Sequence, residues 1–354
     1  MWRKPSPQPP PKGYPAHCGG RGANVGGRGE GFPLLAVRDL QVEYLTPRGP
    51  VRAVDGVSFT LQPGEVFGLA GESGSGKSTV AHAITRILHP PAVITGGDVH
   101  FRGQDVLAMP DADLARFRWR EVSMVFQSAM NALNPVMTIG DQIVDTILAH
   151  ERVPRREARA RAASLLDVVG IESRRLDAYP HQLSGGMRQR ATIAIALALN
   201  PPLMIMDEPT TALDVVVQQE ILQQIEELKE RFGFSILFIT HDLSLLIEFS
   251  DRIAIMYAGQ IVELAPAQEL FAAPEHPYTQ GLMSSFPALT GEKRRLTGIP
   301  GAPPDMLHPP GGCRFHPRCP LVQPMHTRVV PVLRETRAEH FVACHLYDPV
   351  GGGG

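Results

Sequence analysis

The chain lacks any long hydrophobic run. Its longest apolar stretches, residues 191–199 and 203–206, are separated by Asn200-Pro201-Pro202. A helix that spans a bilayer needs about 20 consecutive, mainly apolar residues. The sequence therefore predicts no membrane-spanning segment, although 354 residues with 43% apolar content can form one large core and a smaller second one.

The chain also lacks an excess of charge of either sign. It has 34 Lys and Arg against 36 Asp and Glu, so its formal net charge is −2. A balanced chain creates no broad cationic field that would attract nucleic acid or anionic lipid. We therefore expect no nucleic-acid partner.

Cysteine is scarce as well. The chain has four cysteines and no secretory hydrophobic segment, which is typical of a protein in a reducing cytosol rather than one held together by disulfides. Cys313, Cys319 and Cys344 are grouped in the C-terminal part and are candidate metal ligands, whereas Cys18 is not expected to contribute.

Composition divides the chain into four regions. Residues 1–33 are rich in Pro, Gly and Arg, cannot bury enough apolar surface to offset the entropy of ordering, and are expected to be a disordered tail. Residues 34–273 carry the strand and helix patterns of a large domain. Residues 274–348 are again rich in proline and are expected to form a small cysteine-containing C-terminal module, followed by a tail at 349–354.

The pattern in the large domain predicts an α/β fold with a largely parallel sheet and an antiparallel β subdomain at its start. Residues from about 128 to 199 have helical periodicity and are expected to form an inserted helical subdomain. The predicted strands are 35–44, 51–61, 66–70, 122–126, 203–206, 235–240, 253–257 and 260–264, the last two joined through Ala258-Gly259.

The most informative motif is a glycine-rich loop that follows the predicted strand at 66–70. Residues 71–78 read Gly-Glu-Ser-Gly-Ser-Gly-Lys-Ser, and a helix is predicted over 79–88. Glycines let successive backbone amides turn inward on an anion, and the start of a helix adds positive potential there. Lys77 can reach the outer phosphates and the Ser78 hydroxyl can ligate Mg²⁺, so the loop predicts a nucleotide-phosphate site.

Two further predicted strands end in polar residues. The strand at 203–206 leads into Asp207 and Glu208, and the strand at 235–240 leads into His241. Ligands bind at the carboxyl edge of doubly wound sheets, so these side chains are expected near the nucleotide. Asp207 is suited to orient Mg²⁺ and Glu208 to orient or deprotonate a water molecule.

Residues 183–190 read Leu-Ser-Gly-Gly-Met-Arg-Gln-Arg and precede a helix-compatible run at 191–199. Ser184 could be the N-cap of this helix, with two flexible glycines after it. The bare glycine backbone at a helix start could equally approach a phosphate, which would make a second anion site. The residues alone leave both interpretations open.

In this order the motifs resemble those of ABC transporter ATPases, and the resemblance extends from Leu35 to Met256. Six motifs carry it: the phosphate loop 71–78, the loop at Gln127, the signature 183–187, the strand ending in Asp207-Glu208, the loop Ala212-Leu213-Asp214, and His241.

The resemblance implies an ATPase that uses ATP and Mg²⁺. Gln127 would help Ser78 and Asp207 ligate Mg²⁺ and would sense the membrane partner, Glu208 would polarise the attacking water, and His241 would hold the γ-phosphate. The implied ATP contacts in the same subunit are Tyr44, stacked on adenine, together with Gly71, Glu72, Ser73, Gly74, Ser75, Gly76, Lys77, Ser78, Thr79 and Gln127.

The resemblance also implies a partner ATPase subunit that pairs with this chain head to tail. It favours a paralogue as this partner over a second, identical chain. ATP on one subunit would contact the signature of the other, and Asp214 would connect the two sites. The signature residues that would contact ATP in trans are Ser184, Gly185, Gly186 and Met187.

More specific stretches resemble the ATPases of dipeptide and oligopeptide importers and extend the match to about His345. This implies an energy-coupling subunit at the cytoplasmic face of the cell membrane, acting with two transmembrane permease subunits and, indirectly, an extracytoplasmic binding protein. Nickel chelates or glutathione are alternative cargoes, and a soluble ABC ATPase acting on nucleic acid or ribosomes is a remote alternative. The stretches are residues 179–183, 276–279, 299–301 and 312–320.

Importers of this kind often carry four cysteines in this region, which resemble a [4Fe-4S] site. Here Cys313, Cys319 and Cys344 are present, and His326 lies near the expected position of the remaining cysteine. Three thiolates and an imidazole could hold such a cluster or Zn²⁺, and a site without metal is also open.

Overall fold

The computed structural model describes residues 32–127, 132–210, 214–284 and 298–348. Most of the N-terminal tail, including Cys18, lies outside these ranges, as do the Ala212-Leu213 part of the predicted 212–214 loop and the tail at 349–354.

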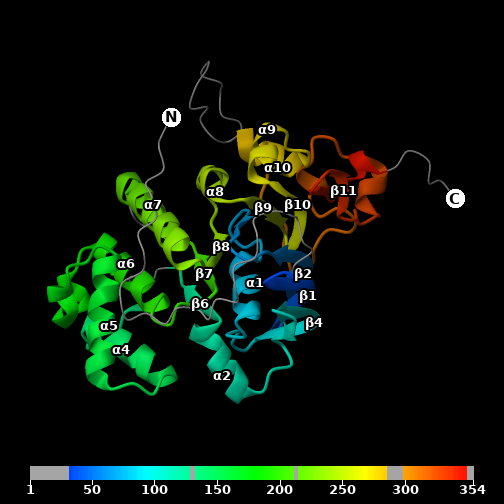
Figure 1. Cartoon of the computed structure of the whole chain (residues 1–354). Helices are drawn as coiled ribbons and strands as arrows, with labels where there is room; N and C mark the ends of the chain where they lie inside the picture. Colours follow the sequence, from blue (N-terminus) through cyan, green and yellow to red (C-terminus); the bar gives the residue numbers. More distant parts are fainter. Residues whose placement is uncertain (1–31, 128–131, 211–213, 285–297, 349–354) are drawn as a thin grey trace. The chain divides into compact units, whose positions relative to one another are not determined.

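The chain divides into two compact units. The helical unit contains residues 110–236 and the short segment 62–64, and the β unit contains residues 34–61, 65–109 and those from 237 onward. In Figure 1 the helices of the first unit between residues 139 and 196 are green, and the first two strands of the second unit are blue.

The β unit begins with an antiparallel sheet of order β2-β1-β4-β5. Val42 on the central strand lies opposite both Val54 and Ile94, and it is fully buried. The strands predicted near residues 35–44 and 51–61 are confirmed. The elements are β1 (Leu35–Thr46), β2 (Gly49–Leu61), β4 (Ala92–Phe101) and β5 (Gln104–Asp105).

The sequence did not reveal β4. The strand is broken by Gly96-Gly97, and most of its residues are half-buried or exposed, so the apolar alternation that predicts a strand is weak. Gly97 has φ +82°, and a Cβ there would lie 2.4 Å from the carbonyl oxygen of Asp39. Glycine is therefore required where the two strands change register.

A second sheet in the β unit contains the strand that leads to the phosphate loop. β3 (Val66–Ala70) is buried at every position and pairs in parallel with β9 (Arg252–Tyr257). β10 (Gln260–Pro266) returns antiparallel to β9 through Ala258-Gly259. Both turn residues have positive φ, as a two-residue hairpin turn of this kind requires, so the predicted hairpin is confirmed.

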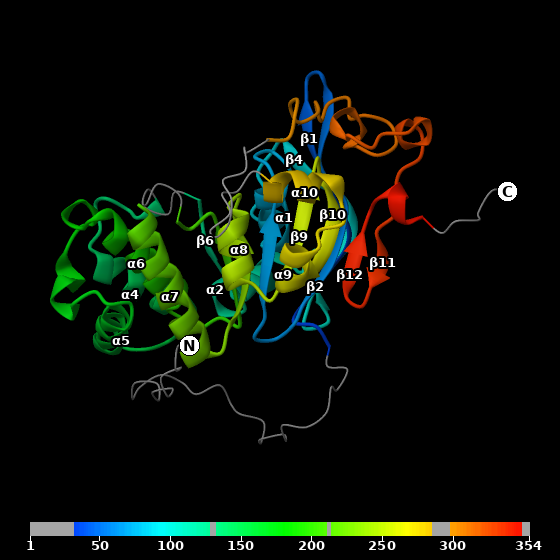
Figure 2. The same cartoon turned by 90° about the horizontal axis from the view of Figure 1, so that it is seen from above.

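The C-terminal strands extend this sheet, and the sequence did not predict them. β12 (His340–Val342) pairs with β10, and β11 (Arg334–Arg337) pairs with β12, both antiparallel. Figure 2 shows the two strands, in red, beside β10. β11 reads Arg-Glu-Thr-Arg and is largely exposed, so it has no apolar pattern to detect.

The remaining elements of the β unit are short. α1 (Lys77–Ile84) begins in the phosphate loop, but the expectation that it would reach Leu88 is wrong. Arg86 adopts a left-handed conformation with φ +51°, which stops the helix, and its guanidinium donates to the carbonyl oxygen of Met109 at 2.5 Å. The others are α8 (Leu243–Phe249), α9 (Ala267–Ala272), α10 (Pro277–Ser284), η3 (His316–Arg318), η4 (Pro324–Thr327) and η5 (His345–Tyr347).

The helical unit contains a parallel pair of strands, β6 (Val122–Val125) and β7 (Leu203–Asp207), and a group of helices. β8 (Ser235–Ile239) runs from the last residues of this unit into the β unit. The helices and 3-10 turns are α2 (Asp111–Arg120), α4 (Ile139–His150), α5 (Arg155–Val168), η1 (Ser173–Asp177), η2 (Pro180–Gln182), α6 (Gly185–Ala196) and α7 (Val215–Phe232).

Apolar stripes on the helices form the core of this unit. Ile143 and Ile147 are fully buried and lie four residues apart on one face of α4. Leu165 on α5 is fully buried as well. Gly140 lies where a Cβ would approach the Leu176 side chain to 2.4 Å, so α4 packs closely on η1.

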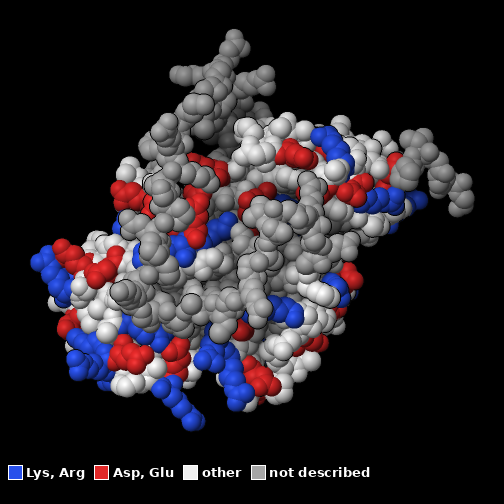
Figure 3. All heavy atoms as spheres, viewed as in Figure 1, with Lys and Arg blue, Asp and Glu red and all other residues white. Residues whose placement is uncertain are grey.

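Within the described ranges, no helix has both the length and the apolar character needed to cross a membrane. On the face shown in Figure 3, Lys and Arg side chains are interspersed with Asp and Glu rather than gathered in one patch. That distribution agrees with the balanced composition.

Candidate functional site

The phosphate loop joins β3 to α1. β3 is buried throughout, so the loop starts from a fixed strand end, and α1 begins at Lys77 with Gly76 as its N-cap. Gly76 has no side chain that could cap the first turn of α1. A helix start of this kind presents backbone amides and positive potential to an anion.

Two glycines in the loop are required by close backbone contacts. Gly71 has φ +147°, and a Cβ there would lie 2.2 Å from the carbonyl oxygen of Met256. Gly76 has φ +104°, and its Cβ would lie 2.3 Å from the carbonyl oxygen of Ala53. The loop backbone is thus pressed against its surroundings at both ends.

Lys77 is buried against the backbone of the same loop. Its Nζ donates to the carbonyl oxygens of Gly71 and Glu72, both at 2.9 Å, and to Ser75 Oγ at 3.3 Å. These bonds hold the ammonium beside the loop that would surround the phosphates. Ser73 and Gly74 are exposed, as expected for residues that face a ligand or solvent.

The predicted adenine contact lies close to this loop. Tyr44 is half-buried, and its hydroxyl is 3.3 Å from Thr79 Oγ1 in the first turn of α1. Ser78, also half-buried, precedes Thr79. The β unit therefore brings Tyr44 to the start of the helix that ends the phosphate loop.

His241 follows β8 at the same sheet edge. The amide of Thr240 donates to the carbonyl oxygen of Leu69 at 3.4 Å, which ties the end of β8 to β3 just before the phosphate loop. His241 is exposed. Asp242 caps α8 by accepting hydrogen bonds from Ser244 and Leu245, so His241 stands between a strand end and a helix cap.

The carboxylates come from the helical unit. Asp207, only 2% exposed, ends β7, and Glu208 follows with φ +47°. A positive φ is uncommon outside glycine and is typical of constrained functional positions. Glu208 Oε2 accepts a hydrogen bond from Gln127 Nε2 at 2.9 Å, so the ends of β6 and β7 bring these two predicted site residues together.

The signature residues open α6. Ser184 is the N-cap, and its Oγ accepts a hydrogen bond from the Met187 amide at 3.3 Å. Gly185 and Gly186 form the first turn, and a Cβ on Gly186 would lie 3.1 Å from the Val217 side chain on α7. The N-cap interpretation is confirmed, and the anion-binding one stays a prediction.

Asp214 is also a helix cap. Its Oδ1 accepts a hydrogen bond from the Val217 amide at 3.0 Å at the start of α7. The side chains of Val215 and Val216 that follow are 76% and 69% exposed.

The predicted ligands of the C-terminal module are partly grouped. The Cys313 amide donates to the carbonyl oxygen of His326 at 2.8 Å. Burial raises the pKa of Cys313 and raises that of Cys344 to about 11. The charge of Cys319 also raises the pKa of both thiols. Burial also lowers the pKa of His326, whose ring stacks on that of His345 with centroids 5.1 Å apart.

This donor set does not fit a metal ion or cluster. Across the described parts of the chain, no three or more His, Cys, Asp or Glu side chains are disposed to hold a metal. His326 Nδ1 already accepts a hydrogen bond from the Gln323 amide at 3.1 Å. The geometry therefore supports neither the [4Fe-4S] nor the Zn²⁺ interpretation.

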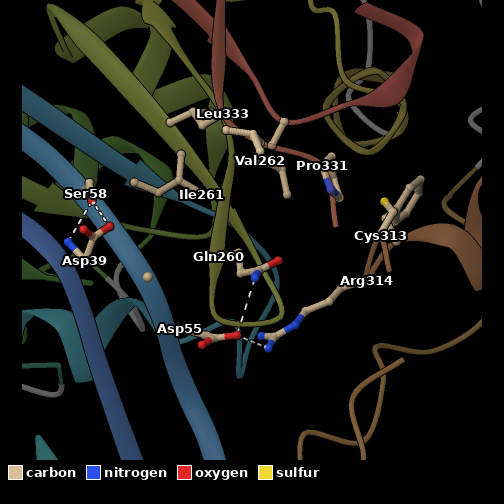
Figure 4. Close-up of a pocket in the computed structure, with 14 residues that line it drawn as sticks. Asp39, Asp55, Ser58, Gln260, Ile261, Val262, Cys313, Arg314, Pro331 and Leu333 are labelled. Atoms are coloured by element: carbon tan, nitrogen blue, oxygen red, sulfur yellow. Dashed lines mark hydrogen bonds and ion pairs between the residues drawn. The ribbon is translucent and has the colours of Figure 1, made fainter. Parts of the chain in front are cut away.

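Sequence reasoning missed two arginines in the same stretch. Arg314 is 7% exposed in its side chain, and it hydrogen-bonds to Asp55 and to the carbonyl oxygen of Ala258. Figure 4 shows it reaching Asp55 beside a cavity of about 370 Å³ that Gln260 and Cys313 also line. Arg318 pairs with Glu72 in the phosphate loop. Their only signal in the sequence was that each arginine adjoins one of the two cysteines, Cys313 and Cys319.

Two family models match this chain. One, described as ABC transporter, matches residues 54–211, and the other, described as the C-terminal region of oligopeptide/dipeptide transporters, matches residues 262–325.

Curated relatives match over most of their length. The oligopeptide transport ATP-binding protein OppD of Bacillus subtilis is 43% identical over 89% of this chain and 89% of its own. The dipeptide transport ATP-binding protein DppD of the same organism is 43% identical over 89% and 95%. A putative peptide import ATP-binding protein of Brucella abortus is 46% identical over 86% and 92%.

Solved structures match as well. A dimeric, post-hydrolysis ATP-binding cassette bound to ADP and Pi has a TM-score of 0.59 and 29% identity, over 66% of this chain and 98% of that one. The structure of cbiO1 from Clostridium perfringens, part of an ABC transporter complex, has a TM-score of 0.59 and 27% identity, over 68% and 91%.

Proposed function

We propose that this chain, which belongs to the family of ABC transporter ATP-binding proteins with the oligopeptide/dipeptide C-terminal region, hydrolyses ATP to drive the import of peptides. The observation that carries the proposal is the phosphate loop. A buried strand delivers it, Gly71 and Gly76 fit only without side chains, and Lys77 is bound to its backbone.

The residues of the β unit fit the phosphates of ATP. The start of α1 and the Lys77 ammonium supply positive potential, and the loop glycines let the backbone approach the ligand. Tyr44, next to Thr79, is proposed to contact adenine, and His241 to contact the γ-phosphate.

Ser78, Gln127 and Asp207 are proposed to hold Mg²⁺. When bound, Mg²⁺ neutralises charge on the phosphates. Glu208 would hold and polarise the attacking water. The Gln127 amide restrains the Glu208 carboxylate through its 2.9 Å hydrogen bond, so a shift of the Gln127 loop would move the general base directly.

A second ATPase subunit would complete each site. Ser184 caps α6 and leaves Gly185, Gly186 and Met187 at a helix start, an arrangement suited to a phosphate carried by the facing subunit. The solved relative with ADP and Pi is dimeric, which supports a pair of ATPase subunits, and we propose that the two lie head to tail. Asp214 would link the two sites, and the partner is proposed to be a paralogue.

The wider assembly follows from the same relatives. We propose two transmembrane permease subunits, an extracytoplasmic binding protein acting through them, and a position at the cytoplasmic face of the cell membrane. The names of the relatives favour peptides as cargo, and nickel chelates or glutathione are the alternative. The proposed organisation is an ATPase domain at 34–273 with a helical subdomain at about 128–199, and a C-terminal module at 274–348.

The test is MgATP hydrolysis by the chain together with its partner ATPase subunit, with either the wild-type chain or its Lys77→Ala variant. The wild type should release phosphate, and the variant should lose both nucleotide binding and turnover. Arg116→Ala, on an exposed side chain of α2, is the matched loss of a cation elsewhere and should hydrolyse ATP normally. Unchanged hydrolysis by Lys77→Ala would contradict the proposed site.

A further inference from the structure

Arg318 ties the C-terminal region to the phosphate loop. Its side chain is only 5% exposed, and the guanidinium forms a two-point ion pair with the Glu72 carboxylate, with N–O distances of 2.7 and 3.0 Å. It also donates to the carbonyl oxygens of Pro300 at 2.9 Å and Ile299 at 3.4 Å. The guanidinium therefore bridges the 299–301 stretch and the loop.

Glu72 is the second residue of the phosphate loop and is bound at each of its polar groups. Its amide donates to the Tyr278 hydroxyl at 2.9 Å. Its carbonyl oxygen accepts from Lys77 Nζ at 2.9 Å and from the Ser75 amide at 3.2 Å. One residue thus connects the lysine that would contact ATP to two groups from the C-terminal part of the chain.

The contact is held in place by a compact aromatic cluster. The rings of Tyr257 and Tyr278 have centroids 4.6 Å apart, and Phe315 lies 5.2 and 5.4 Å from them. The Arg318 guanidinium lies over the Tyr257 ring at 5.8 Å. A paired and packed arginine of this kind has little freedom to leave the loop.

We propose that Arg318 is a positioning residue for the nucleotide site: by pairing with Glu72 it shields the phosphate loop from that carboxylate and sets the affinity for ATP. This inference rests on the proposed function, because it requires ATP phosphates in the loop. It assigns to the C-terminal region a direct influence on the ATP site.

The physical basis is charge. A carboxylate within the loop repels the phosphates of ATP, and a two-point arginine pair compensates for that charge. Removing the buried Arg318 side chain leaves the half-buried Glu72 carboxylate without its compensating charge. Arg318→Met should therefore weaken ATP binding by about tenfold, and Glu72→Gln, which removes the repelling charge, should strengthen it by about threefold.

The decisive variant combines the two changes. If Arg318 acts by compensating Glu72, the double variant Arg318→Met with Glu72→Gln should bind ATP within about threefold of the wild type, because neither charge remains. If Arg318 only fastens the C-terminal region, the double variant should be as weak as Arg318→Met or weaker.

Arg314→Met is the matched control. Arg314 lies in the same stretch and is equally buried, but its hydrogen bonds go to Asp55 and Ala258. It should leave ATP affinity within about twofold of the wild type. An equal loss in both arginine variants would overturn the proposal in favour of a general fastening role.

The experiment measures the dissociation constants of ATP and ADP by isothermal titration calorimetry on the full chain, and KM and kcat for hydrolysis by the chain together with its partner ATPase subunit. Arg318→Met should raise KM and leave kcat within about threefold. Wild-type affinity in Arg318→Met, or no recovery in the double variant, would overturn the inference. If Lys77→Ala also bound ATP normally, the proposed site itself would be wrong.

A conservative pair covers the case in which Arg318→Met fails to fold. Arg318→Lys keeps the charge but cannot make the two-point contact, so it should weaken ATP binding about threefold. In the Glu72→Gln background this loss should disappear. An equal loss in both backgrounds would overturn the proposal.

Discussion

Replacing Gly71 by alanine tests the geometry of the phosphate loop. The added Cβ would lie 2.2 Å from the carbonyl oxygen of Met256, where real contacts of this type stay beyond 3.0 Å, and φ at Gly71 is +147°. The loop start must therefore move by nearly an ångström or change its backbone conformation. Displacements of that size in a binding site can cost about 10²-fold in rate.

Gly74 in the same loop is the matched control. It also has a positive φ, +77°, but a Cβ there would meet no described atom within 4 Å. Gly74→Ala therefore carries only backbone strain of about 1 kcal/mol, or roughly a fivefold effect. Gly71→Ala should lower kcat/KM for ATP by about 10²-fold.

The assay is steady-state hydrolysis with a calorimetric dissociation constant for ATP, and the thermal midpoint is recorded to exclude unfolding. The reasoning would be refuted if the two alanine variants lost activity equally, or if Gly71→Ala bound and hydrolysed ATP as the wild type does.

Three further predictions concern other parts of the chain. Glu208→Gln should slow hydrolysis by about 10³-fold and accumulate an ATP-bound dimer in light scattering, and undiminished turnover would remove Glu208 from its role. Ser184→Ala should slow hydrolysis by about 10²-fold because a phosphate contact is lost. The control Thr138→Ala, which removes the cap of α4, should cost only about 1 kcal/mol of stability. Equal activity in the two variants would count against a trans site. Burial lowers the pKa of His276 from 6.5 to about 4. Between pH 6.5 and pH 4 this histidine is therefore protonated in the unfolded chain but not in the folded one. The free energy of unfolding should fall by up to about 3 kcal/mol as the pH drops from 6.5 to 4. His276→Asn should reduce the dependence of the unfolding free energy on pH in denaturant titrations, whereas His308→Asn, on an exposed side chain, should leave it unchanged. An unchanged pH dependence in His276→Asn would contradict the role of His276.

The sequence was most informative where local pattern and chemistry coincide. The apolar run at 66–70 is typical of a buried strand, and the eight residues after it have a composition suited to phosphate, so strand, loop and helix start were all predicted. The end of α1 was not, because Arg86 adopts a left-handed conformation that no residue type signals. At Ser184 the pattern left two interpretations, and the hydrogen bond from Met187 settled only the cap.

The features that sequence reasoning missed depend on contacts between distant segments. β11 and β12 exist because β10 offers an edge, and their own residues carry almost no strand pattern. Arg318 and Glu72 are far apart in the chain, and a charged residue gives no sign of its partner. Gln127 was predicted as a metal ligand, but its hydrogen bond to Glu208 needed the parallel pairing of β6 and β7.

The central claim is that ATP hydrolysis at this site drives peptide import. The direct measurement is uptake of a labelled peptide into proteoliposomes that contain the chain with its permease subunits, partner ATPase and binding protein, comparing wild type with Glu208→Gln. We predict MgATP-dependent uptake by the wild type and none by the variant, which still binds ATP. Uptake that persists in Glu208→Gln, or that proceeds in the wild type without ATP, would contradict the account.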